Sequence, residues 1–92
     1  MANVSVGLGA VQNAQTVCSG AIQDLNSSAQ KLNNRYREAG QRWRDKKYTQ
    51  LGGIVNECSR ALKAPVDELF ECLNKLKEIE KRLLEYDGTN IS

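Results

Sequence analysis

Apolar residues recur along most of the chain at steps of three and four, the spacing that keeps one side of an α-helix apolar. The first part of this ladder is Val4, Leu8, Val11, Gln15, Cys18, Ile22, Leu25, Ala29, Leu32, Tyr36, Ala39 and Trp43. The second part is Tyr48, Leu51, Val55, Cys58, Leu62, Pro65, Leu69, Cys72, Leu76, Ile79, Leu83 and Tyr86. In the first part, Gln15 is the only polar interruption. A ladder sustained over this many turns predicts coiled-coil packing.

The ladder breaks between Trp43 and Tyr48, where the step is five and a continuous heptad pattern is lost. Gly40 is placed to end the first helix as a left-handed C-cap. Asp45 is placed to accept hydrogen bonds from the free N–H groups that open the next helix. The turn motif is therefore expected at Gly40, Trp43 and Asp45.

These boundaries predict helices over about 8–39 and 44–86. Because the connection between them is short, the helices are expected to run antiparallel, with their apolar stripes facing each other. The fold class is therefore all-α, and residues 1–92 are expected to form a single helical-hairpin domain.

The second predicted helix contains two weak points, Gly52-Gly53 and Pro65. Each glycine costs roughly 1 kcal/mol relative to alanine, and a proline inside a helix costs about 3 kcal/mol. The ladder nevertheless keeps its phase across both. We therefore predict close helix approach or local flexibility at the glycines and a kink or short break at Pro65. The alternative is a three-helix domain that turns at Gly52-Gly53.

The second helix is also apolar beside its main stripe. The flanking residues are Ile54, Ala61, Val66, Phe70, Leu73 and Leu84. One facing helix cannot cover this width, so the pattern predicts dimerisation into a four-helix bundle or docking on a larger helical partner. The residues expected to face that partner are Ile54, Val66, Phe70, Leu73 and Leu84.

Charge adds little at the level of the whole chain, because 13 Lys and Arg against 11 Asp and Glu give a net charge of +2. Locally, residues 35–47 contain six basic residues against Glu38 and Asp45. This excess fits either a phosphate-binding patch or a solvated hairpin tip. We favour the tip and expect no nucleic-acid partner, because neither an aromatic platform nor a recognition motif accompanies the charges.

The sequence offers little for catalysis, because it has no histidine and no Gly-rich phosphate loop or nucleophile motif. Cys18, Cys58 and Cys72 all fall on the ladder, which favours small buried apolar side chains over redox or zinc chemistry. Cys58 and Cys72 are about 21 Å apart along one helix, too far for a disulfide. We expect no enzyme activity, no cofactor and no metal site.

Targeting features are also missing from the sequence. No apolar run approaches the roughly 18 residues of a membrane span, and MANVSVGLGAVQNAQ lacks the basic start and apolar block of a cleaved signal peptide. We therefore expect synthesis in the cytoplasm as a soluble protein, with any export using a route that does not read such a signal.

A chain near 100 residues with two antiparallel helices and a tryptophan in the turn resembles the WXG-motif family of type VII secretion substrates, the early-secretory-antigen-like proteins. The tryptophan is Trp43 in Gly40-Gln41-Arg42-Trp43-Arg44-Asp45. The family's glycine after Trp-X is replaced by Asp45. This departure is typical of a divergent branch, such as the small helical partners encoded beside larger toxins in Gram-positive bacteria.

The resemblance implies a homodimeric or heterodimeric four-helix bundle, exported folded and without a cleaved signal peptide. It implies as partners a related helical protein, the N-terminal helical region of a secreted toxin, and the secretion ATPase. The family's C-terminal export signal is an aromatic residue followed four positions later by an acid. Here Tyr86 is followed by Asn90, and the nearest acid is Asp87, which implies an incomplete signal that a partner supplies or completes.

Two interpretations of Trp43 remain open and are compatible: it plugs the open end of the hairpin, or it helps to build a surface that the secretion ATPase recognises. A different class of function is also open. The chain is then an intracellular coiled-coil structural or assembly protein, similar to the family only because few folds suit such a ladder.

Overall fold

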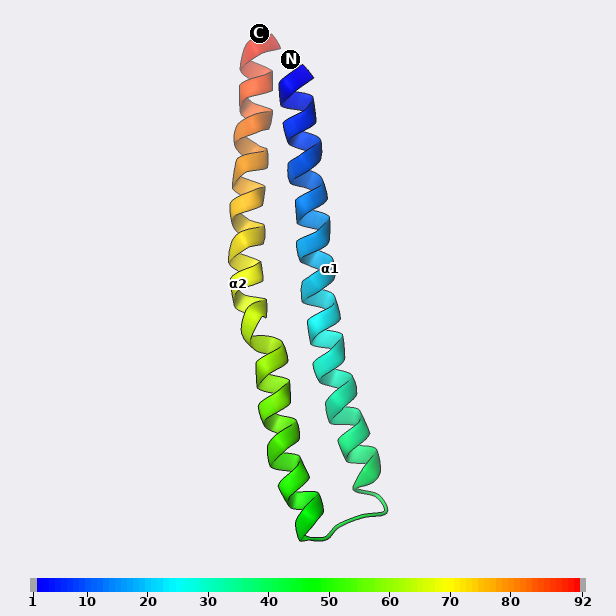
Figure 1. Cartoon of the computed structure of the whole chain (residues 1–92). Coiled ribbons are helices and arrows are strands. Elements are labelled where there is room, and N and C mark those ends of the chain that lie inside the picture. The colour runs from blue at the N-terminus through cyan, green and yellow to red at the C-terminus, as the bar shows by residue number, and fades with distance from the viewer. Residues whose placement is uncertain (1, 92) are drawn as a thin grey trace. The chain divides into compact units, whose positions relative to one another are not determined.

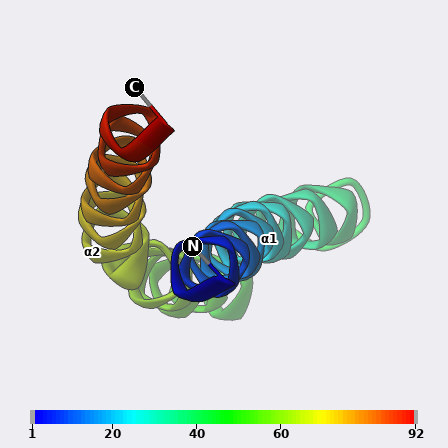
Figure 2. The same cartoon turned by 90° about the horizontal axis from the view of Figure 1, so that it is seen from above.

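The protein is an all-α helical hairpin in the computed structural model, which describes the backbone of residues 2–91 and the side chains of residues 5–86. Helix α1 spans Ala2–Ala39 and helix α2 spans Lys46–Ile91. These two helices are joined by one short connection, residues 40–45, which Figure 1 shows, and Figure 2 shows the same two helices from above. The predicted fold class is confirmed.

Helix α2 begins at Lys46, two residues later than predicted, because Asp45 is its N-cap. The Asp45 carboxylate accepts a hydrogen bond from the backbone N–H of Tyr48 at 3.0 Å, and its carbonyl accepts from Thr49. This is the capping role predicted for Asp45. The outer ends of both helices run further than predicted, to Ala2 in α1 and to Ile91 in α2.

The predicted left-handed C-cap at Gly40 is wrong, since no glycine in the described part of the chain has a positive φ. The last turn of α1 instead closes through right-handed turns, with the Gly40 and Trp43 N–H groups bonded to the Tyr36 and Ala39 carbonyls. The Arg44 Nε–H donates to the Gly40 carbonyl at 2.8 Å. A side chain thus satisfies a carbonyl that the end of a helix leaves open.

Helix α2 passes through Gly52, Gly53 and Pro65 without interruption. The alternative of a third helix after a turn at the glycines is therefore wrong. A break at Pro65 is also absent, although proline removes one backbone donor from a helix interior.

The chain divides into two compact units, each an antiparallel pair of helical segments. The turn unit is Ile22–Asp67 and contains the connection between the helices. The terminal unit combines the part of α1 up to Ala21 with the part of α2 from Glu68 onward. Each unit is described separately below.

The ladder of α1 is confirmed: every one of its positions from Leu8 to Ala39 is buried or half-buried. In the turn unit Ile22 and Ala29 are buried, at 7% and 0% exposure. Trp43 continues the 3–4 spacing in the sequence but does not belong to the apolar stripe of α1, because it lies in the connection and is 39% exposed.

The ladder of α2 is correct at every second position, while among the other positions only Leu51 and Pro65 are half-buried. Tyr48, Val55 and the residues at intervals of seven up to Leu83 face α1 as predicted. The residues between them that face α1 are Gly52, Ser59, Val66, Leu73 and Glu80. The predicted positions were one residue earlier, and four of those, Cys58, Cys72, Ile79 and Tyr86, are exposed.

This shift corrects two further predictions. Val66 and Leu73, expected to face a partner, are buried between the helical segments at 8% and 7% exposure. Cys58 and Cys72, expected to be buried, are exposed, and only Cys18 is half-buried; all three are free thiols. The physical reason lies in the contacts that hold Gly52, Ser59 and Glu80 in the interface.

Candidate interaction surfaces

Tyr36 and Tyr48 close the turn unit next to the connection between the helices. Their rings stack at a centroid distance of 4.3 Å with an angle of 6° between the ring planes. The Tyr36 hydroxyl donates to the Tyr48 carbonyl at 3.1 Å, and the Tyr48 hydroxyl donates to the Tyr36 carbonyl at 2.9 Å. Desolvation, followed by the hydrogen bond with Tyr48, raises the pKa of Tyr36.

The Tyr48 side chain lies against Gly40, four residues after Tyr36, and the Tyr36 side chain lies against Gly52, four residues after Tyr48. A Cβ on Gly40 would lie 2.7 Å from Cζ of Tyr48, and a Cβ on Gly52 would lie 2.8 Å from Cζ of Tyr36. Gly52 is thus a site of close helix approach, as predicted, whereas a Cβ on Gly53 would meet nothing within 4 Å. The repeated Tyr-X3-Gly spacing is a sequence signal for this pair, and the ladder alone does not reveal it.

Trp43 lies in the connection and packs against the outside of this tyrosine pair. Its ring is 5.8 Å from that of Tyr48, tilted by 59°, and 39% of the residue remains exposed. A hydrogen bond from the Trp43 side chain, followed by that from the Tyr48 N–H, lowers the pKa of Asp45. Asp45 therefore has a local role, because it caps α2 and accepts a hydrogen bond from the tryptophan.

A group of hydrogen-bonded polar side chains lies in the interface of each unit. In the terminal unit, Gln12 and Gln15 donate through Nε2 to the Glu80 carboxylate at 3.0 and 3.2 Å. These bonds, Gln12 first, lower the pKa of Glu80. In the turn unit, buried Ser59 donates to Oδ1 of Asn33 at 3.3 Å. Because such groups bond well in one register only, they fix how the helical segments align.

The shifted register leaves an apolar surface on one side of α2, which we call the α2 flank. In the turn unit it consists of Leu51, Ile54, Cys58 and Ala61, and in the terminal unit of Cys72, Ile79 and Tyr86. Steps of three, four and seven place the members of each group on one side of the helix. Ile54 is 57% exposed, Ile79 44% and Tyr86 57%.

Two of the other predicted partner-facing residues, Phe70 and Leu84, are 47% and 52% exposed in the terminal unit. Their heptad position lies on the opposite side of the α2 interface from Ile79 and Tyr86. The terminal unit therefore exposes apolar side chains on both sides of α2. Within the predicted export signal only the Tyr86 side chain is described, and those of Asp87 and Asn90 lie outside the described residues.

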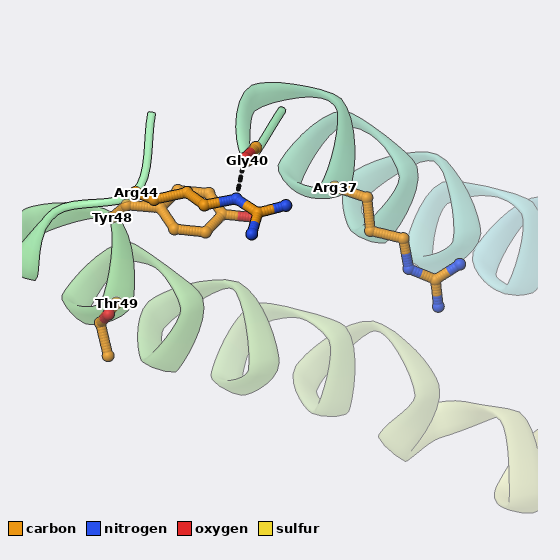
Figure 3. Close-up of a pocket in the computed structure, with 5 residues that line it drawn as sticks. All are labelled: Arg37, Gly40, Arg44, Tyr48 and Thr49. Carbon is orange, nitrogen blue, oxygen red and sulfur yellow. Dashed lines mark hydrogen bonds between the residues drawn. The ribbon is translucent and has the colours of Figure 1, made fainter. Parts of the chain in front are cut away.

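Two neighbouring hollows lie in the turn unit, on the side of α2 away from the α2 flank. One hollow of about 450 Å³ is lined by Arg37, Gly40, Arg44, Tyr48 and Thr49 (Figure 3). A second of about 340 Å³ is lined by Asn26, Gln30, Asn33, Asn34, Arg37 and Lys63. We call these two hollows, which share Arg37, the cationic groove. The local basic excess indicated Arg37 and Arg44, but not Lys63 or the amides.

Comparisons of the chain with protein-family models, with curated proteins and with solved structures find no match. Within the described residues, neither helix contains a stretch long and apolar enough to cross a membrane. Among the same residues, no three or more carboxylates and thiols gather in a way that could hold a metal ion.

Proposed function

We propose that the protein is a small helical substrate or targeting partner of a bacterial type VII secretion system, acting by helix packing with itself or with a larger exported protein. The α2 flank is the observation that carries this proposal. Exposed apolar side chains that recur at helical spacing along one side of a helix are typical of an interaction surface.

The α2 flank of the turn unit has the spacing of a helix-binding surface. Leu51, Ile54, Cys58 and Ala61 follow one another at steps of three, four and three, and the last three are exposed. A second helix lying against this side would complete a layer of helix packing, as in a four-helix bundle. The partner is therefore a related helical protein, a second copy, or the N-terminal helical region of a secreted toxin.

Trp43 links this packing to secretion in the proposal. Its indole is supported by Tyr48 and Asp45, yet 39% of the residue is exposed at the turn. An ordered and partly exposed aromatic residue suits recognition by the secretion ATPase, because little side-chain freedom is lost on binding.

The secretion role is tested with Trp43→Ala, and Val17→Ala, an exposed apolar residue on α1, serves as the control. Trp43→Ala should remain helical and bind its partner, but its amount in the culture supernatant should fall, while Val17→Ala is exported normally. The measurement is immunoblotting of supernatants from strains with and without the secretion ATPase. Unchanged export of Trp43→Ala would contradict the role of Trp43, and export without the ATPase would contradict the proposal.

The packing role is tested separately with Ile54→Glu and Val17→Glu, which place the same charge on an exposed apolar position of each helix. Only Ile54→Glu should prevent co-purification of a partner from the native host. The mass of the intact complex identifies that partner and the stoichiometry. A stable monomer without a partner, or equal loss in both variants, would refute packing through the α2 flank.

The second candidate is an intracellular coiled-coil structural or assembly protein. The α2 flank supports this candidate equally, because it explains association without any link to secretion. Retention of the protein in cells with an active secretion system, together with partner loss in Ile54→Glu, would favour this candidate.

A further inference from the structure

The cationic groove is a second candidate interaction surface of the turn unit. Arg37, Arg44 and Lys63 contribute three positive charges, and none of the described residues lining its two hollows is acidic. The Arg44 Nε–H bonds to the Gly40 carbonyl (Figure 3), which fixes the base of the guanidinium group while its two NH2 groups remain available for a ligand. The groove therefore suits an anionic ligand.

Amide side chains extend the groove along α1. Asn26, Gln30, Asn33 and Asn34 lie on one side of the helix together with Arg37, and α1 advances about 16 Å between the first and last of these five residues. An amide side chain carries both donors and acceptors, like a peptide group. The groove therefore matches about five residues of an extended polypeptide, at roughly 3.3 Å per residue, better than it matches one phosphate.

Nucleic acid fits the groove less well. Proteins that bind single strands usually present aromatic faces on which bases stack. Tyr48 is the only aromatic residue among the described residues that line the groove, and one face of its ring already stacks on Tyr36 at 4.3 Å. The charges and amides thus have no stacking platform beside them.

We propose that the cationic groove binds an acidic polypeptide segment. Carboxylates of the segment pair with Arg37, Arg44 and Lys63, and its peptide groups bond with the amides of α1. This site goes beyond the proposed function, because Lys63 lies on the opposite side of the α2 interface from Ile54 and Cys58. A helix bound at the α2 flank and a segment bound in the groove do not compete.

The test measures binding of fluorescein-labelled octaglutamate to the full chain by fluorescence anisotropy at low salt. Two double variants that lose the same net charge are compared. The groove variant combines Arg37→Gln and Lys63→Gln, and the control variant combines Arg42→Gln and Arg60→Gln. Arg42 and Arg60 are exposed and lie outside the groove. We expect at least a tenfold loss of affinity in the groove variant, because two charge-assisted contacts disappear, and less than a twofold loss in the control. Equal losses would overturn the proposal.

A second pair of variants tests the amides. Asn34→Asp keeps the shape of the side chain but places a negative charge in the groove, while Asn13→Asp makes the same change on α1 in the terminal unit. Octaglutamate binding should be lost only in Asn34→Asp, with helicity by circular dichroism unchanged in both. Equal binding by both variants, or tighter binding of octathymidylate than of octaglutamate to the unmodified chain, would refute an acidic-polypeptide site.

Discussion

The turn unit and the terminal unit have the same architecture, but they differ in packing and charge. Among the residues whose side chains the structure describes, the turn unit holds the stacked tyrosines and four of the five buried apolar residues, and the terminal unit holds the fifth, Leu73. The turn unit carries nine Lys and Arg against five Asp and Glu, and the terminal unit four against six. One unit is thus closed by its own contacts and basic, and the other is more open and acidic.

This difference also bears on the proposed partner, because the two units would gain unequally from packing against it. The terminal unit aligns its two segments through Gln12, Gln15 and Glu80, which specify register but add little apolar burial. It also exposes apolar residues on both sides of α2, among them Phe70 and Tyr86. If a partner packs against α2 as proposed, it should stabilise the terminal unit more than the turn unit, since hydrophobic stabilisation follows the apolar area removed from water.

The largest expected effect concerns the interface of the terminal unit. Leu73→Ala should lower the free energy of unfolding by about 2 kcal/mol or more, because it leaves a cavity at a buried position. Leu84→Ala removes the same atoms from a residue that is 52% exposed and should cost much less. Urea unfolding followed by circular dichroism measures both. Equal losses would mean that the interface does not follow the register described above.

The two adjacent glycines provide the next test, in the turn unit. Gly53→Ala should stabilise α2 by about 1 kcal/mol, because alanine is the better helix former and the added methyl group meets no neighbour. Gly52→Ala should lose that gain, because the methyl group displaces Tyr36 from its stack and from the Tyr48 carbonyl. Thermal unfolding compares the two variants. A melting temperature of Gly52→Ala as high as that of Gly53→Ala would show that the tyrosine pair tolerates displacement.

A pH effect smaller than these involves one carboxylate in each unit. The pKa values of Glu80 and Asp45 are lowered in the folded chain from their ordinary values of 4.5 and 3.8. Their contribution to stability is therefore present above these values and is lost as the pH falls through the lower folded-state pKa. The melting temperature should therefore decrease as the pH is lowered from neutral through the folded-state pKa values of these two carboxyl groups.

Isosteric amides separate the two carboxylates. Glu80→Gln and Asp45→Asn should each make the melting temperature less dependent on pH, because the titrating group is gone while a hydrogen-bond acceptor remains. The melting temperature of the double variant should depend less on pH than that of either single variant. A pH profile that neither substitution alters would mean that other carboxylates cause the acid sensitivity.

The smallest expected effect is on thiol reactivity. Cys58 and Cys72 are exposed and Cys18 is half-buried, so the first two should react faster with iodoacetamide. Peptide mass mapping of the labelled chain gives the three rates. If a partner covers the α2 flank, Cys58 and Cys72 should become slower while Cys18 is unchanged. Protection of Cys18 alone would place the partner elsewhere.

Much of the fold was predictable because helix formation depends on local spacing. The apolar steps from Leu8 to Ala39, an interruption of the helix around Trp43 and the capping side chain of Asp45 are all visible in the sequence and all present in the structure. The candidate surfaces were only partly predictable. Ile54, Phe70 and Leu84 are exposed as expected, but Val66 and Leu73 are not.

The sequence by itself determined that the chain forms two amphipathic helices and where the connection between them lies. Only the tertiary structure decided which side of α2 faces α1, because a count of apolar residues favours Cys58 and Ile79 over their neighbours. Ser59 and Glu80 lie in the interface instead, because Asn33 accepts a hydrogen bond from Ser59 and Gln12 and Gln15 donate to Glu80. Gly52 lies in the interface because the Tyr36 ring occupies the position that a side chain on this residue would take. These contacts join residues far apart in the chain. In the register that these contacts fix, apolar residues of α2 such as Cys58 and Ile79 are exposed, and they form the α2 flank.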